Sequence, residues 1–163
     1  MLDQNNFTKA LTFTLKYEGG WVDDKDDPGG KTNYGISDAG DGTIDGLIDL
    51  DRDGSGDVPV ADLTREQAIK IYYDHYWLKS GCKDLPLPIA VCVFDTAVNC
   101  GVGRAKYFLK NCRDTNDYVA RRINFYSKLI TSNPKLTKFY KGWINRVVDL
   151  RKYADILAKE LTP

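Results

Sequence analysis

Acidic side chains and glycines crowd into one short stretch of this chain, residues 18–36, which reads EGGWVDDKDDPGGKTNYGI. Glu18 is followed by four aspartates and then by the turn sequence Pro28-Gly29-Gly30. Packed acids repel one another and glycines cost backbone entropy, so a purely structural segment rarely concentrates both. A catalytic cleft needs a carboxyl group that carries a proton beside a second polar group that handles water. The stretch therefore indicates acid–base chemistry centred on Glu18.

A helix is expected directly before Glu18, because Phe7, Leu11 and Leu15 recur at helical spacing over roughly residues 4–17. The glycines at positions 19 and 20 are typical of the chain just past a helix end. The helix would thus hold Glu18 at its C-terminal end, with Trp21 as an apolar neighbour that favours the protonated acid.

A second acidic segment, residues 38–62, mixes glycines and aspartates with apolar residues and is expected to form a small β-hairpin lobe. Part of it matches the first nine positions of a calcium loop, with Gly54 at the sixth. The matching residues are Asp49, Asp51, Asp53, Ser55 and Asp57. Alternating acids on a loop turned by glycine converge on one hard cation, so a structural Ca²⁺ is expected here.

The calcium match is incomplete at position twelve, where Val60 replaces the expected bidentate glutamate. Asp62, Asp45 and Asp41 are candidates to complete the ligand shell. The alternative is a solvated Asp-Gly hairpin without an ion.

The remaining chain is expected to be helical. Residues 64–67 form a capping box, so a helix begins at about residue 65 and runs to about residue 79. Residues 89–98 are apolar nearly all round, which predicts a central buried helix. Its polar residues Asp95 and Asn99 lie four apart and share a face, and a buried acid needs a partner or a cleft. Further helices are expected over 104–112, over 116–131 (opened by Asn116 or Asp117) and around 143–161, where Arg146 lies outside the apolar stripe.

Charge is distributed unevenly along the 163 residues, although the formal net charge is zero. Residues 1–100 carry 9 Lys/Arg against 18 Asp/Glu, and residues 101–163 carry 14 against 5. The basic part can attract either an anionic polymer or the acidic part of the same chain, and both readings stay open. Nucleic-acid binding is not expected, because the basic residues form no recognisable motif and the acidic part would repel phosphates.

Length and composition set further bounds. The length suits one domain, and no apolar run is long enough to span a membrane, so stable membrane insertion is not expected. The four cysteines lack metal-binding spacing and His75 is not near one, which leaves free thiols or, after export, a disulfide. The first residues lack the features of a signal peptide, so synthesis in a cytoplasm is expected.

Four motifs stand out along the chain: EGG at 18–20, DDPGG at 26–30, TNYGIS at 32–37 and FDTAVNCGVGRA at 94–105. Together they resemble glycoside hydrolase family 108, the EGG muramidases found as phage endolysins and in bacterial cell-wall remodelling. FYKGWINRV at 139–147 looks like the C-terminal region often described there as peptidoglycan-binding. The resemblance covers nearly the whole chain.

The resemblance implies a lysozyme-like α+β fold that is mainly α, with helices around a buried central helix and a small β-hairpin lobe. It implies one domain, with a catalytic part over residues 1–88, a β lobe at about 32–62 and a peptidoglycan-binding-like helical part over 89–163. The implied reaction is hydrolysis of the β-1,4 bond between N-acetylmuramic acid and N-acetylglucosamine in bacterial peptidoglycan, without a cofactor.

The resemblance also assigns roles. Glu18 matches the family's catalytic glutamate, and Asp27 and Thr32 match a Glu…Asp…Thr arrangement of lysozyme-like phage enzymes, with Asp24 and Asp26 competing for the aspartate role. Glu18 would protonate the glycosidic oxygen while Asp27 and Thr32 position a water. That gives inversion for carboxyl groups roughly 6.5–9.5 Å apart and a covalent intermediate for a much shorter gap. The residues expected to line the sugar cleft are Tyr34, Asp95 and Asn99.

A monomer is expected, which would reach the periplasm or cell wall after release by a separate holin if the source is a phage. A bacterial source stays open. The alternative functions are a non-catalytic peptidoglycan-binding or scaffold protein on the same fold, and a calcium-dependent interaction module.

Overall fold

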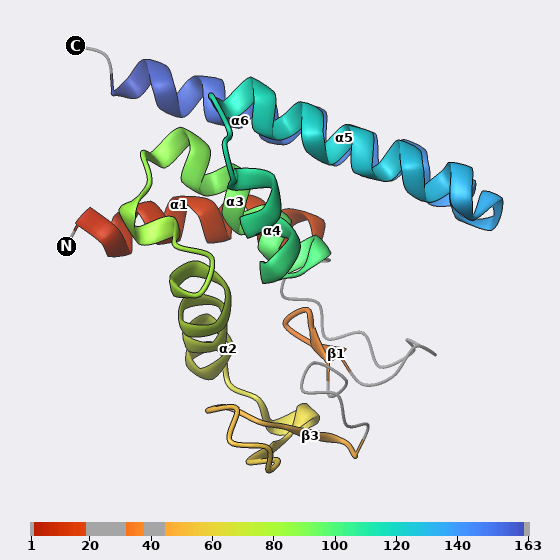
Figure 1. The fold of residues 1–163 in the computed structure, drawn as a ribbon. Helices are drawn as coiled ribbons and strands as arrows, with labels where there is room; N and C mark the ends of the chain where they lie inside the picture. The colour runs from red at the N-terminus through yellow and green to blue at the C-terminus, as the bar shows by residue number, and fades with distance from the viewer. Residues whose placement is uncertain (1, 19–31, 38–44, 162–163) are drawn as a thin grey trace.

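The protein is described by a computed structural model that covers residues 2–18, 32–37 and 45–161. Its main helices are α1 (Leu2–Tyr17), α2 (Arg65–Ile71), α3 (Leu87–Cys100), α4 (Val102–Leu109), α5 (Thr115–Ser132) and α6 (Thr137–Glu160). Its strands are β1 (Thr32–Asn33), β2 (Ile36–Ser37), β3 (Leu47–Ile48) and β4 (Val58–Pro59). Figure 1 shows a large helical lobe, with α2 leading down to a small lobe that carries β3 and β4. The predicted mainly helical, lysozyme-like α+β fold is confirmed.

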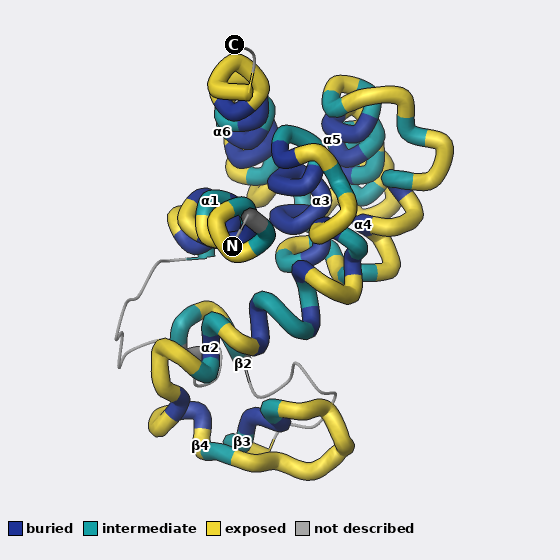
Figure 2. Tube along the Cα trace, turned by 90° about the vertical axis from the view of Figure 1, so that its left-hand side faces the viewer, coloured by how far each residue is buried: buried dark blue, intermediate teal, exposed yellow. Residues whose placement is uncertain are grey.

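α3 is the centre of the helical lobe. Residues 90–97 are all buried, and the helix packs against α1, α4, α5 and α6. Figure 2 shows the buried positions concentrated on α3 and on the sides of the surrounding helices. Full burial of a side chain such as that of Phe94 contributes about 1.5–3 kcal/mol. The predicted central buried helix is confirmed and extends from Leu87 to Cys100.

α5 and α6 are the longest helices and pack against each other, joined by the short 3-10 helix η5 (Pro134–Leu136) (Figure 1). Their contact includes stacked rings of Tyr126 and Trp143, whose centroids are 4.9 Å apart. α5 begins one residue earlier than expected. The cap is Asp114, whose carboxylate accepts a hydrogen bond from the backbone N–H of Asp117 at 2.9 Å. The predicted caps Asn116 and Asp117 were therefore wrong.

The helix expected over residues 65–79 is α-helical in its first part and π-helical in its second part. Thr64 and Gln67 form the predicted capping box at its start. From Tyr72 to Leu78 the helix widens into a π-helix, η3, in which Tyr72, His75 and Trp77 are buried. Residue propensities do not predict π-helical turns. Such turns are rare in proteins, and those that occur are frequently near functional sites.

The β lobe contains two antiparallel strand pairs, β1 with β2 and β3 with β4. A small second core supports it, formed by the buried residues Ile48, Val60, Leu63, Ala68 and Ile71. The last two belong to α2, so this helix ties the lobe to the rest of the molecule.

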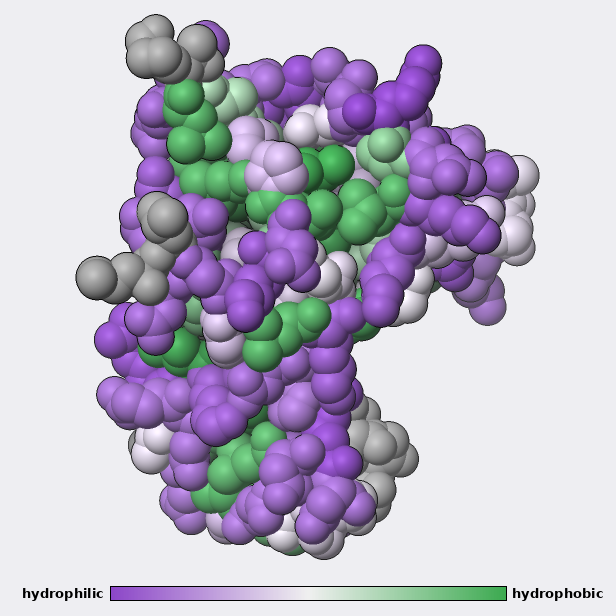
Figure 3. Space-filling model, turned by 60° about the vertical axis from the view of Figure 1, so that its left-hand side comes forward, coloured by the Kyte–Doolittle hydropathy of each residue, from purple (hydrophilic) through white to green (hydrophobic). Residues whose placement is uncertain are grey.

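Figure 3 shows one face of the molecule, on which hydrophobic side chains form separate patches among hydrophilic ones. None of the described helices combines the length and apolar character needed to cross a membrane. The four cysteines are unpaired. His75 is buried, with its Nε2 atom 3.0 Å from the carbonyl oxygen of Leu50.

Candidate active site

Glu18 lies directly after α1 and continues its last turn, because its backbone N–H donates to the carbonyl of Thr14 at 3.2 Å. Its side chain is 24% exposed, so the carboxylate is open to solvent on one side. Of the other predicted catalytic residues, Asp27 lies outside the described residues, as do its competitors Asp24 and Asp26. Thr32 is placed by its backbone in β1.

Arg146 of α6 connects Glu18 to the interior of the protein. Its Nη1 atom lies 2.7 Å from Glu18 Oε1, and its Nη2 atom lies 2.7 Å from Asp95 Oδ1. Its Nε atom also donates to Asp95, at 3.1 Å from Oδ2. One nearly buried guanidinium therefore holds a partly exposed carboxylate with one nitrogen and a buried carboxylate with the other two.

Asp95 is the buried end of this network. Besides Arg146 it accepts hydrogen bonds from Arg122 Nη1 at 2.6 Å and from Thr14 Oγ1 at 3.1 Å. Burial alone would raise the pKa of Asp95, but the guanidiniums of Arg122 and Arg146 outweigh it and hold the pKa below its usual value. Burial would lower the pKa of Arg146, but the negative charge of the Asp95 carboxylate outweighs burial and raises this pKa above its usual value.

The predicted shared face of Asp95 and Asn99 is confirmed, since Arg122 contacts both. Its Nη2 atom donates to Asn99 Oδ1 at 3.2 Å, and the hydroxyl of Tyr126 donates to the same oxygen at 2.5 Å. The network draws on α1, α3, α5 and α6.

The turn between β1 and β2 packs on Glu18 from another side. Tyr34 and Gly35 have φ values of 56° and 73°, as a tight two-residue hairpin requires. A Cβ atom on Gly35 would lie 3.2 Å from Glu18 Cβ and 2.9 Å from Tyr72 Oη. Tyr72 in turn donates its hydroxyl to the carbonyl of Tyr34 at 3.1 Å. Burial, and then the negative charge of Glu18, raises the pKa of Tyr72.

The residues expected to line the sugar cleft are placed differently from one another. Tyr34 is half-buried in the turn beside Glu18, and Asn99 is exposed at the end of the arginine network. Asp95 has no exposed surface with which to contact a sugar, because both its oxygens face arginines inside the protein. Asp95 instead holds Arg146, which in turn contacts Glu18.

The sequence pattern did not indicate Arg122 or Arg146. Arg146 was expected outside the apolar stripe of the last helix, and this was wrong, because only 6% of the residue is exposed. It borders that stripe, three positions after Trp143 and next to Val147. The available signal was Asp95, since an acid on a buried helix requires a cationic partner.

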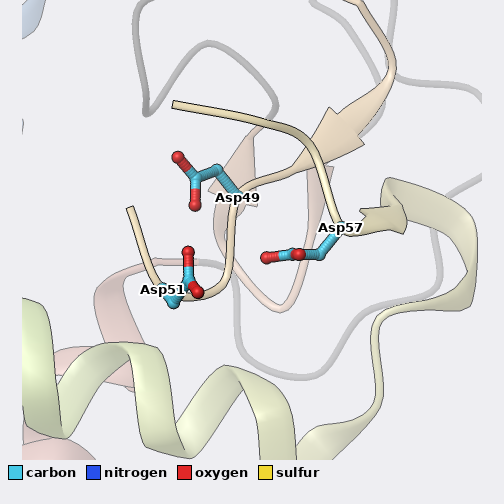
Figure 4. A group of neighbouring side chains, drawn as sticks. All are labelled: Asp49, Asp51 and Asp57. Atoms are coloured by element: carbon cyan, nitrogen blue, oxygen red, sulfur yellow. The ribbon is translucent and has the colours of Figure 1, made fainter. Parts of the chain in front are cut away.

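The predicted calcium loop lies between β3 and β4, far along the chain from Glu18. Carboxylate oxygens of Asp49, Asp51 and Asp57 all lie within 4.8 Å of one another. Figure 4 shows these three side chains turned toward a common space. The carboxylate of Asp53 accepts hydrogen bonds from the backbone N–H of Ser55 at 2.8 Å and from its hydroxyl at 2.5 Å. Hard oxygen ligands such as these suit Ca²⁺ better than a soft metal.

The described part of the chain also has two hollows that do not include Glu18. One of about 760 Å³ lies between α1 and the α2–η3 segment. Another of about 480 Å³ lies between α4 and α5. No residue of the arginine–carboxylate network lines either hollow, although α1 and α5 contribute residues both to a hollow and to the network.

Comparisons with known proteins identify the family and the fold of this chain. The sequence matches the family model described as glycosyl hydrolase 108 over residues 11–101, a segment that includes Glu18 and Asp95. The fold is similar to that of Brucella abortus SagA, with a TM-score of 0.70 and 24% sequence identity. This similarity covers 98% of the present chain and 99% of the SagA chain. No functionally curated protein matches the sequence.

Proposed function

The chain belongs to the glycosyl hydrolase 108 family and is a peptidoglycan hydrolase of the lysozyme class, and we propose that Glu18 is its general acid. The bond cleaved in this proposal is the β-1,4 linkage between N-acetylmuramic acid and N-acetylglucosamine. The observation that carries it is the place of Glu18: inside the family match, at a helix end, partly exposed, and held by Arg146. A carboxyl group held in this way has a fixed orientation toward a bound sugar.

In the proposed reaction, Glu18 donates its proton to the glycosidic oxygen as the bond from that oxygen to the anomeric carbon breaks. Positive charge develops on the sugar ring, and a water molecule adds to the anomeric carbon. The proton that this water loses passes to a second carboxylate, for which we propose Asp27, with Thr32 helping to orient the water. Roughly 6.5–9.5 Å between the two carboxyl groups would give inversion, and a much shorter distance would give a covalent intermediate.

The ion pair with Arg146 is a contact of the ionised Glu18 carboxylate, whereas a general acid must carry a proton. A bound sugar would exclude water from the exposed side of Glu18, and desolvation favours the neutral form of a carboxyl group. We therefore expect Glu18 to acquire its proton as substrate binds.

The deciding experiment compares wild type with Glu18→Gln on purified, outer-membrane-stripped Gram-negative cell walls. Turbidity and new reducing ends are measured together, and circular dichroism checks that both proteins fold. We expect clearing and reducing ends from wild type only, because glutamine keeps the shape but cannot donate the proton. Full lysis by Glu18→Gln would refute the role of Glu18. Sedimentation with the walls without reducing ends from either protein would instead favour a non-catalytic wall-binding protein.

We also propose that the loop at Asp49, Asp51 and Asp57 binds a structural Ca²⁺, with Asp53 and Ser55 completing the set predicted from the sequence. The chemistry proposed above uses no metal, so this ion has no catalytic step in it. The acids of the loop come close together, and their mutual repulsion would be relieved by one divalent cation.

An endolysin role, with a monomer released to the cell wall through a holin, remains our proposal. Expression of wild type in a bacterium with and without a pore-forming holin tests it. Lysis only in the presence of the holin is the expected outcome.

A further inference from the structure

Both arginines of the Glu18 network lie beyond residues 11–101, the segment that matches the family model. Arg122 belongs to α5 and Arg146 to α6. We propose that Arg146, held by Asp95, is a positioning residue for the Glu18 carboxylate, so that α5 and α6 complete the catalytic site. This inference rests on the proposed role of Glu18 and adds to it the part of the protein that holds the acid in place.

The contacts of Arg146 use the planar shape of its guanidinium. Two of its nitrogens hold Asp95, and the third is left to hold Glu18 at 2.7 Å. Asp95 cannot turn away, because Arg122 and Thr14 hold it from two further helices. A lysine has one charged nitrogen and lacks this fork, so it cannot reproduce both contacts with the same geometry.

Glu18 is restrained on its other side as well. The turn at Gly35 approaches its Cβ atom, and the guanidinium carbon of Arg146 lies 5.4 Å from the ring centre of Tyr17. Glu18 therefore lies between α6, which contacts its carboxylate, and the β1–β2 turn, which approaches its Cβ atom. Since misplacement of a reacting group by about 1 Å can cost about 100-fold in rate, this restraint has a direct catalytic consequence.

Charge within the network is balanced when Glu18 is ionised, with two carboxylates and two guanidiniums. Among the described residues, the groups that face Glu18 are Arg146, the hydroxyl of Tyr72 and, through Arg146, Asp95. Arg146 is the cation among these groups. Without it, the Glu18 carboxylate would lose the charged partner that holds it at 2.7 Å.

The kinetic test compares Arg146→Lys and Arg146→Gln with wild type on soluble peptidoglycan fragments, at a temperature well below each melting point. We expect kcat to fall about 10–100-fold in both variants, with KM little changed, because the acid is misplaced while sugar contacts remain. Arg146→Lys keeps the charge but not the planar fork, so it should not restore kcat.

Arg151→Gln is the matched control. Arg151 lies on the same helix, is partly exposed, and contacts Asn116 and Asp155 away from Glu18. Its replacement should leave kcat and KM as in wild type. Wild-type kcat in both Arg146 variants would overturn the proposal, as would a loss of activity that only follows the loss of folded protein.

A second measurement does not depend on activity. The sequence contains three glutamates, Glu18, Glu66 and Glu160, so ¹³C labelling of glutamate carboxyl groups gives three NMR signals. Glu18→Gln identifies the Glu18 signal. We expect its chemical shift at neutral pH to move in Arg146→Gln and to stay in place in Arg151→Gln. An unchanged chemical shift in Arg146→Gln would overturn the inferred contact. A moved signal together with an inactive wild type would refute the muramidase function and leave the contact established.

Discussion

Asp95 is the residue on which the support of Glu18 depends. An ionised carboxylate inside a protein costs several kcal/mol unless cations and hydrogen bonds surround it. Asp95 has no exposed surface and is met by Arg122, Arg146 and Thr14. Its charge holds both arginines in the interior, and through Arg146 it reaches the partly exposed Glu18. A buried structural ion pair and a functional side chain are thus one unit.

Asp95→Asn should destabilise the protein by about 3–5 kcal/mol near neutral pH, because it leaves two buried guanidiniums with one neutral partner. The pKa of Asp95 is lowered in the folded state, so its contribution is present above the usual aspartate range. That contribution is lost as pH falls through the folded pKa. Urea unfolding of both proteins across acidic pH measures this, and the difference between them should shrink on acidification. A difference that is constant over the whole range would contradict the prediction.

Gly35→Ala should reduce both stability and activity. The position has a φ of 73°, and a Cβ atom there would come within 2.9 Å of Tyr72 Oη. We expect a loss of about 1–3 kcal/mol for the backbone strain, with a further shift of Glu18 or Tyr72 to relieve the contact. Thermal unfolding and the reducing-end assay measure the two effects.

Gly142→Ala is the control for Gly35→Ala. Gly142 lies inside α6, and a Cβ atom there would meet nothing within 4 Å. Alanine in a helix interior should raise stability by about 0.5–1 kcal/mol and leave activity unchanged. Equal effects at both glycines would show that the contact with Glu18 is unimportant.

At the scale of elements, hydrophobic spacing and caps predicted the helices well. The capping box at Thr64 and the buried α3 follow from local sequence, because capping and burial are encoded within a few residues. The change to π-helix at Tyr72 and the burial of Arg146 could not be predicted, since both depend on contacts with distant segments. Glu18 was predicted from its motif, whereas its partner lies 128 positions away in the chain.

The loop between β3 and β4 provides a test at the same scale. Ca²⁺ should raise the melting temperature of wild type and a chelator should lower it, because a cation that binds only the folded state stabilises it. Asp49→Asn should abolish this response, since Asp49 is the buried ligand candidate of the three clustered acids. Glu18→Gln should respond as wild type does. Equal melting temperatures of wild type in Ca²⁺ and in chelator would rule out the calcium site.

At the scale of the whole molecule, the uneven charge has a structural use. Two arginines of the basic part, Arg122 and Arg146, pair with two acids of the acidic part, Glu18 and Asp95. The acidic and basic parts of the chain therefore attract each other directly, through the ion pairs around Glu18 and Asp95. Attraction of an anionic polymer by the remaining basic residues stays a prediction.

This arrangement predicts the behaviour of the segment 1–101, which ends where the family match ends. Removing residues 102–163 exposes the faces of α3 that pack on α4, α5 and α6, and strips Asp95 of both arginines. We expect the fragment to show no cooperative unfolding and no reducing-end release, even on soluble fragments that need no wall binding. If the helical part after residue 101 were instead a separable wall-binding module, the fragment would fold, cleave soluble substrate and lose only its retention on walls. Thermal unfolding and the soluble-substrate assay separate the two cases, because Arg146, which holds the Glu18 carboxylate, belongs to α6.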